Sequence, residues 1–145
     1  MTGTFLPTTE WLVHDWYRAC IDTGALCIQR CASCGTWRHP PRRFCARCAS
    51  DDARFEPVSG TGTIFSLAVS HRSLDPSWQE LVPFPTLVVE LDEGPRVLTA
   101  THAAPADVAI GDRVTVSVEP RSDDFAMLWG ELSGDDARRA SAPPA

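Results

Sequence analysis

The stretch that decides the fold begins Cys31-Ala-Ser-Cys34-Gly35 and ends Cys45-Ala-Arg-Cys48, with ten residues between the two Cys-x-x-Cys pairs. Two pairs at this separation are typical of a four-thiolate zinc site. Two intervening residues let a tight turn direct both sulfurs of a pair at one ion, and two such turns complete a tetrahedron with Zn–S distances of about 2.3 Å. Because all four ligand positions are filled by protein, the sequence predicts a structural metal and not a catalytic one.

Three alternatives to zinc stay open at this point. The cysteines can form disulfides, one pair can act as a redox-active Cys-x-x-Cys, or the same ligands can hold a rubredoxin-like iron. The N-terminus has no basic region followed by an apolar core, which predicts no signal peptide and a cytoplasmic location. A reducing cytoplasm favours metal over disulfides.

The remaining thiols and the histidine of this region have simpler predicted roles. Cys20 and Cys27 lie outside the paired spacing, and we expect both to be buried small apolar groups. Cys27 precedes Cys31 by four residues and can in principle compete as a ligand. We expect His39 to be a surface residue, because four thiolates already complete the site.

Positive charge is concentrated around the cysteines although the chain as a whole is acidic. The 13 basic residues are all Arg, the net charge is −6, and residues 29–54 hold six Arg against two Asp. These arginines can offset the charge of the thiolates. Alternatively, they form a patch for an anionic partner or for the phosphates of coenzyme A (CoA), with Arg42, Arg43 and Arg47 as the candidate residues.

A strongly aromatic helix is predicted before the cysteines, capped by Thr8 or Thr9. Its aromatic face exceeds what a small domain readily buries, so we predict that Trp11, Trp16 and Tyr17 contact a partner subunit. The alternative is that this face packs on its own domain.

From Phe55 onward the pattern changes to β-strands. Five strands are predicted, at Gly60–Ser70, Thr86–Leu91, Arg96–Thr101, Arg113–Val118 and Phe125–Leu132. Five strands of which the first is long and marked by glycines suit an OB-type barrel. The predicted organisation is an arm and helix at 1–25, a zinc ribbon at 26–54, an OB fold at 55–132 and a disordered tail at 133–145.

The order of these motifs resembles a known family, the zinc-ribbon/OB-fold acyl-CoA-associated proteins (domain-of-unknown-function family 35). The resemblance covers about residues 10–132. It rests on Leu26-Cys-Ile-Gln-Arg-Cys31, Cys34-Gly35, His39-Pro-Pro-Arg42, Cys45-Ala-Arg-Cys48, Val58-Ser-Gly-Thr-Gly-Thr-Ile64, Pro85-Thr-Leu-Val-Val-Glu-Leu-Asp-Glu-Gly94 and Ile110-Gly-Asp-Arg-Val114. It implies a mainly β fold in which an N-terminal helical segment and a rubredoxin-like zinc ribbon precede a five-stranded OB-fold barrel.

The resemblance also implies a function. Members of this family partner thiolase-superfamily enzymes, including thiolases, acyltransferases and steroid side-chain aldolases. The chain is therefore expected to be a non-catalytic accessory subunit of a thiolase-fold enzyme acting on acyl-CoA thioesters, by retro-aldol or Claisen cleavage or by acyl transfer. A hetero-oligomer of two plus two chains and a steroid acyl-CoA substrate are part of this expectation.

The residues themselves agree with a subunit that lacks a catalytic centre. Ser70-His71 has no acid at motif spacing, and the four paired cysteines are assigned to metal. Two other functions remain: a stand-alone acyl-CoA-binding module, and a single-stranded nucleic-acid binder. The acidic barrel half with few aromatic residues argues against nucleic acid, and no apolar run approaches the eighteen residues of a membrane span.

Overall fold

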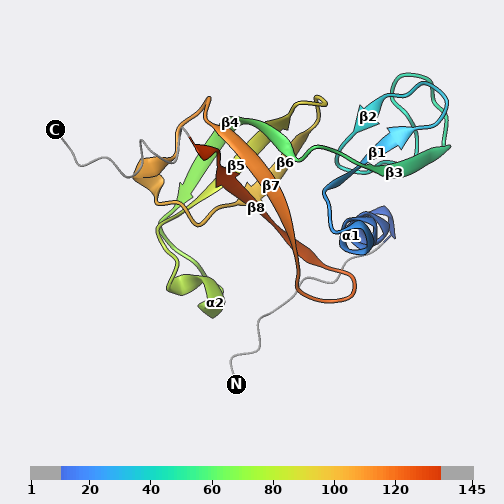
Figure 1. The fold of residues 1–145 in the computed structure, drawn as a ribbon. Coiled ribbons are helices and arrows are strands. Elements are labelled where there is room, and N and C mark those ends of the chain that lie inside the picture. The colour runs from blue at the N-terminus through green and yellow to red at the C-terminus, as the bar shows by residue number, and fades with distance from the viewer. Residues whose placement is uncertain (1–10, 135–145) are drawn as a thin grey trace.

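An N-terminal helix joins two β-structures in the computed structural model, which describes residues 11–134 (Figure 1). The elements in chain order are α1 (Trp11–Thr23), β1 (Cys27–Cys31), β2 (Trp37–Arg38), β3 (Ala53–Pro57), β4 (Thr61–Ser70), α2 (Pro76–Gln79), β5 (Phe84–Leu91), β6 (Arg96–Ala100), η1 (Pro105–Asp107), β7 (Arg113–Pro120) and β8 (Ala126–Leu132). The predicted arm and the cap at Thr8 or Thr9 lie outside the described residues, as does the predicted tail beyond residue 134. None of the described helices is long and apolar enough to cross a membrane.

The ribbon is a three-stranded antiparallel sheet in which β1 lies between β2 and β3. Gln29 of β1 faces Arg38 of β2, and Cys31 of β1 faces Ala53 of β3. Strand β3 therefore spans the predicted domain boundary between residues 54 and 55, and all of it pairs with β1 of the ribbon. The division into domains at this point stays a prediction.

The second structure is a closed barrel with the strand order β4-β5-β6-β8-β7. Neighbouring strands are antiparallel apart from the short parallel contact of β6 with β8. Each of the five strands predicted from the sequence is present, which confirms the OB-type barrel. Its interior is filled by aliphatic side chains that are at most 1% exposed, namely Ile64, Leu87, Val89, Val97 and Val114.

Strand β4 is bent where it must pair with both β5 and β7. Its register against β5 shifts between Ile64 and Ser66, as at a β-bulge. A Cβ atom at Gly62 would lie 2.7 Å from the Cγ1 atom of Val89 and closer still to the carbonyl oxygen of Glu90. Only glycine allows this approach, which explains the glycine at the second position of the strand.

The connection between β4 and β5 contains a helix that the sequence did not predict. This is the short helix α2, which lies between the strands predicted at Gly60–Ser70 and Thr86–Leu91. Asp75 caps this helix, because its carboxylate accepts a hydrogen bond from the backbone N–H of Ser77 at 2.9 Å.

Helix α1 packs between the ribbon and the barrel (Figure 1). On the ribbon side, the indole N–H of Trp16 donates a hydrogen bond to the carbonyl oxygen of Cys27 at 2.6 Å. On the barrel side, the ring of Tyr17 lies 5.0 Å from the ring of Phe125, just before β8. The helix therefore couples the two β-structures.

Candidate metal centre

The two Cys-x-x-Cys pairs form two turns with the same hydrogen-bond pattern. The N–H of Gly35 donates to the carbonyl oxygen of Cys31 at 2.9 Å, and the N–H of Ala49 donates to that of Cys45 at 2.8 Å. Gly35 and Ala49, which follow the second cysteine of each pair, have φ angles of 71° and 60°. The two turns thus present their thiols from equivalent positions.

These turns bring four sulfurs to one point. The Sγ atoms of the four paired cysteines lie within 4.8 Å of one another: Cys31, Cys34, Cys45 and Cys48. Two of the separations, Cys31–Cys48 and Cys34–Cys45, are 3.6 Å. Zn–S bonds of about 2.3 Å in a tetrahedron place sulfurs about 3.8 Å apart, whereas a disulfide needs about 2.0 Å. The cluster fits a four-thiolate metal ion.

The four thiols differ in pKa because each has different neighbours. The Sγ atom of Cys34 lies 3.2 Å from the Oγ1 atom of Thr36, and hydrogen bonding to Thr36 lowers the pKa of Cys34 to about 6. A backbone hydrogen bond from Ser50 lowers the pKa of Cys48, but the neighbouring thiols and desolvation raise it to about 12. Four thiolates cannot coexist this closely without a cation, which is the role a metal ion would fill.

Of the two other cysteines, Cys20 lies on α1 and Cys27 lies on β1, facing that helix. Cys20 and Cys27 are fully buried, as predicted. The Sγ atom of Cys27 lies 3.6 Å from the carbonyl oxygen of Ala19 and 3.3 Å from the hydroxyl oxygen of Thr23, so it does not compete for the cluster. Burial is the largest cause that raises the pKa of Cys20 to about 12, and this thiol is therefore poorly nucleophilic.

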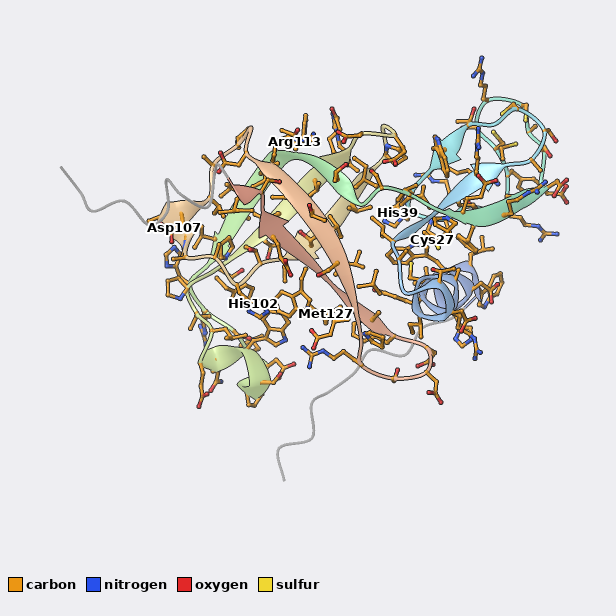
Figure 2. The ribbon with its side chains drawn as sticks, in the orientation of Figure 1. Cys27, His39, His102, Asp107, Arg113 and Met127 are labelled. Carbon is orange, nitrogen blue, oxygen red and sulfur yellow. The ribbon has the colours of Figure 1, made fainter. Side chains whose placement is uncertain are left out.

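His39, which was predicted to be a surface residue, is half-buried and packs against α1. Its ring lies 4.7 Å from the ring of Trp16, and Figure 2 shows it beside Cys27, facing α1. Its Nδ1 atom is shielded from solvent and has no hydrogen-bond partner within residues 11–134. Burial lowers the pKa of His39 to about 4, so the imidazole is neutral at pH 7. Sequence reasoning missed this because the packing partner comes from a helix 23 residues away.

The candidate arginines divide into two groups. Arg42 and Arg47 line a cleft of about 570 Å³, together with Arg38, which the sequence did not single out. Arg43 does not line this cleft, and its guanidinium lies 5.4 Å from the ring of Phe44.

The three residues of α1 that were predicted to contact a partner differ in their exposure to solvent. Trp16 is 6% exposed and belongs to the chain's own core, whereas Tyr17 is half-buried. Trp11 is 84% exposed. Of the three, Trp11 alone is left exposed to solvent, and its contact with a partner stays a prediction.

Two domain families match consecutive parts of this chain. The ChsH2 rubredoxin-like zinc ribbon domain matches residues 19–54, and the ChsH2 C-terminal OB-fold domain matches residues 55–119. These matches cover the four-cysteine cluster, the ribbon sheet and most of the barrel.

Two proteins of similar sequence are a scaffold protein and a hydratase subunit. The chain is 30% identical over 113 residues to a DUF35 domain-containing scaffold protein of Methanothermobacter thermautotrophicus. The aligned region covers 74% of this chain and 81% of that protein. It is 42% identical over 85 residues to the 3-oxo-4,17-pregnadiene-20-carboxyl-CoA hydratase alpha subunit of Mycobacterium tuberculosis. The aligned region covers 58% of this chain and 26% of that protein. The chain thus spans about a quarter of the length of the hydratase subunit.

A solved structure matches nearly end to end. A chain of the Ltp2-ChsH2(DUF35) aldolase superposes with a TM-score of 0.77 at 30% identity, over 88% of this chain and 98% of that one.

Proposed function

The chain belongs to the DUF35 family, and from this premise we propose that it is a non-catalytic subunit that binds and completes a thiolase-fold enzyme acting on acyl-CoA thioesters. The observation that carries the proposal is the similarity over 98% of a chain from a two-component aldolase. The match covers 88% of this chain, which supports a common way of binding a partner.

The side chains support placing the chemistry on the partner. Within residues 11–134 no hydrogen bond joins a serine, threonine or cysteine to a histidine, the pairing that activates a nucleophile. The ring of His102 is stacked 3.8 Å from the ring of Trp129, and His39 is half-buried and neutral at pH 7. Four of the six cysteines lie in the metal cluster.

The cluster of four thiols is proposed to hold a structural zinc ion. The ligands would be Cys31, Cys34, Cys45 and Cys48, whose spacing fits a tetrahedral ion. The ion would fix the two turns against each other and take no part in the reaction. Metal analysis of the purified protein distinguishes zinc from iron, because an iron tetrathiolate absorbs visible light and a zinc one does not.

The partner's reaction is proposed to be a retro-aldol or Claisen cleavage, or an acyl transfer, in a complex of two plus two chains. A steroid acyl-CoA is the proposed substrate. The names of the similar aldolase and of the pregnadiene carboxyl-CoA hydratase subunit support this choice. The second candidate function, acyl-CoA binding by this chain, is favoured by the cleft that Arg42 and Arg47 line.

Co-expression with a thiolase-fold protein, sought first among the neighbouring coding sequences, tests the proposal. We expect the two proteins to co-purify with a mass of two plus two chains, and acyl-CoA cleavage to require both. Turnover of an acyl-CoA by this chain alone would contradict the proposal, as would a fully active partner that gains nothing from its addition.

A further inference from the structure

An apolar hollow lies beside the barrel, between α1 and the loop that carries α2. Its volume is about 200 Å³. The β7–β8 hairpin lies between these two helices (Figure 1), and the start of β8 forms part of the wall. None of the described residues that line the hollow is charged. Most of the wall is made by aromatic and aliphatic side chains, among them Tyr17, Trp78, Phe84, Leu98, Phe125 and Met127.

This hollow lies on the face that OB folds use to bind ligands. That face is formed by the second and third barrel strands and is flanked by the loops after the first and fourth strands. The strands are β5 and β6 here, and the two loops supply Trp78 and Phe125. Single-stranded nucleic acid needs a basic groove, and small-molecule pockets start at about 300 Å³. An uncharged hollow of about 200 Å³ instead suits one or two apolar side chains.

The walls of the hollow leave apolar surface exposed. Leu98 is 62% exposed on β6, and Phe84 of β5 is only half-buried. The ring of Trp78 lies 4.9 Å from the ring of Phe84. The ring of Tyr17, on α1, lies 5.0 Å from the ring of Phe125. Two aromatic pairs from different elements therefore line one opening, and covering such surface is favourable.

Two segments of the chain lie outside the described residues, and one of them matches the chemistry of the hollow. Residues 1–9 carry no charged side chain and include Phe5-Leu6-Pro7. Residues 135–145 carry two Asp and two Arg, and their apolar residues are all Ala or Pro. This second segment also follows the far end of β8, whereas Met127 of the hollow lies at the start of that strand. The N-terminal segment is the better match.

The N-terminal segment is also long enough to reach the hollow. Tyr17 lies six residues after Trp11, which is about 9 Å along α1. Phe5 lies six residues before Trp11, and six extended residues span up to about 20 Å. Trp11 has a φ of 58°, the left-handed conformation, which turns the chain away from the helix axis. A chain that turns back at Trp11 therefore brings Phe5 to the level of Tyr17.

We propose that residues 1–10 fold back at Trp11 and cover this hollow, with Phe5 packed against Trp78 and Met127 and Leu6 packed on Leu98. The ligand-binding face of the OB fold is then occupied by the protein's own N-terminal segment. This occupant keeps nucleic acids and sugars off the face. The contact is made within one chain and needs no partner subunit.

Methyl NMR of the zinc-loaded full chain tests the contact directly. The chain has two methionines, so labelled methionine methyl groups give two signals, from Met1 and Met127. We expect a nuclear Overhauser effect between the Met127 methyl group and the ring of Phe5. Phe5→Ala should abolish this effect and shift the Met127 signal. Phe44→Ala, which removes a phenylalanine that is 56% exposed in the ribbon, should leave the signal in place.

Cleavage by chymotrypsin after Phe5 measures how often the segment leaves the hollow. The rate follows the population of the open form when opening and closing are fast. Leu98→Gln places a polar group at the hollow and should speed this cleavage about fivefold or more. Ile110→Gln is the matched control, because Ile110 is 67% exposed and does not line the hollow. It should change the rate less than about twofold.

Absence of a contact between Phe5 and Met127 in the full chain would overturn the proposal. Equal acceleration of cleavage by Leu98→Gln and Ile110→Gln would also overturn it. A contact found only between labelled and unlabelled chains in a mixed sample would assign the hollow to a second copy of the chain. A Met127 signal that shifts on addition of a thiolase-fold partner, but not in Phe5→Ala, would assign the hollow to that partner.

Discussion

Gly35 and Ala49 take equivalent places after the second cysteine of each pair, but only Gly35 is the residue suited to a positive φ. The left-handed conformation costs a residue with a Cβ atom about 1–2 kcal/mol, and glycine avoids this cost. Part of this stabilisation by glycine is lost, because glycine also raises the conformational entropy of the unfolded chain. The second turn is therefore held in place against a small strain at Ala49.

Ala49→Gly should raise the free energy of unfolding of the zinc-saturated protein by about 0.5 kcal/mol, and Gly35→Ala should lower it by a similar amount. A Cβ atom at Gly35 meets only the guanidinium of Arg30, at 3.7 Å, so its cost is confined to the backbone. Urea unfolding with excess zinc measures both changes. Gly134→Ala, at a glycine with open space and no positive φ, is the control. Opposite signs from those expected would show that the turns are not equivalent.

His39 makes stability depend on pH. Its folded pKa of about 4 lies below the ordinary value of 6.5, so between these values the unfolded chain binds a proton that the folded chain excludes. The stability contributed by the neutral ring is complete above pH 6.5 and is lost as the pH falls towards 4. Between pH 7 and pH 5 this loss amounts to about 2 kcal/mol.

The variant His39→Phe keeps a ring against Trp16 and removes the titration. We expect the wild type to lose about 2 kcal/mol relative to this variant between pH 7 and pH 5. Acid release of zinc affects both proteins, so the difference isolates the histidine. His71→Phe, at an exposed histidine, should follow the wild type. Parallel curves for the wild type and His39→Phe would refute the assignment.

At the scale of elements, α1 has two distinct aromatic roles. Trp16 is a core residue whose indole N–H reaches the ribbon, and Trp11 is 84% exposed. The helical pattern predicted an aromatic face, but it could not separate these roles, because the separation depends on the angle at which the helix meets the ribbon. Helix α2 was missed for a related reason: one turn is too short to show a period.

Replacing the two tryptophans separates these roles. Trp16→Phe should lower the free energy of unfolding by about 2 kcal/mol, because it removes the 2.6 Å hydrogen bond to the carbonyl of Cys27 and leaves that oxygen only a long 3.9 Å contact with the thiol of Cys20. Trp11→Ala should leave stability unchanged and weaken binding to the thiolase-fold partner by about tenfold or more. Thermal unfolding and partner titration measure the two effects. Leu74→Ala, at a leucine that is 85% exposed, is the control for loss of apolar surface. Unchanged partner affinity in Trp11→Ala would move the interface elsewhere.

At the scale of the whole molecule, the features that could be predicted are those determined by residues close together in the sequence. The cysteine spacing located the four-thiol cluster, and alternating apolar residues between turns located all five barrel strands. The contacts that join the ribbon to the barrel run through Trp16, Tyr17 and His39, which meet partners far away in sequence. No periodicity or spacing records such contacts, so the cleft with Arg38 also had to come from the structure.

The same connections predict how far the effect of metal removal spreads. The ribbon is a small sheet whose turns depend on the proposed zinc ion. The barrel, by contrast, is a closed ring of paired strands around its own hydrophobic core. Helix α1 is attached to both structures. Chelation should therefore open the ribbon and loosen α1, which loses its contacts with Cys27 and His39, while the barrel stays folded.

Hydrogen exchange read by mass spectrometry follows each part. After chelation, amides of β1 and α1 should exchange at least about tenfold faster, and those of β5 should stay protected. Cys34→Ser should reproduce this pattern without a chelator, and Cys20→Ser should not, because that thiol lies outside the cluster. Equal loss of protection in β1 and β5 would mean that ribbon and barrel unfold as one cooperative unit. Unchanged exchange in β1 would mean that the four thiols shape the ribbon without a metal ion.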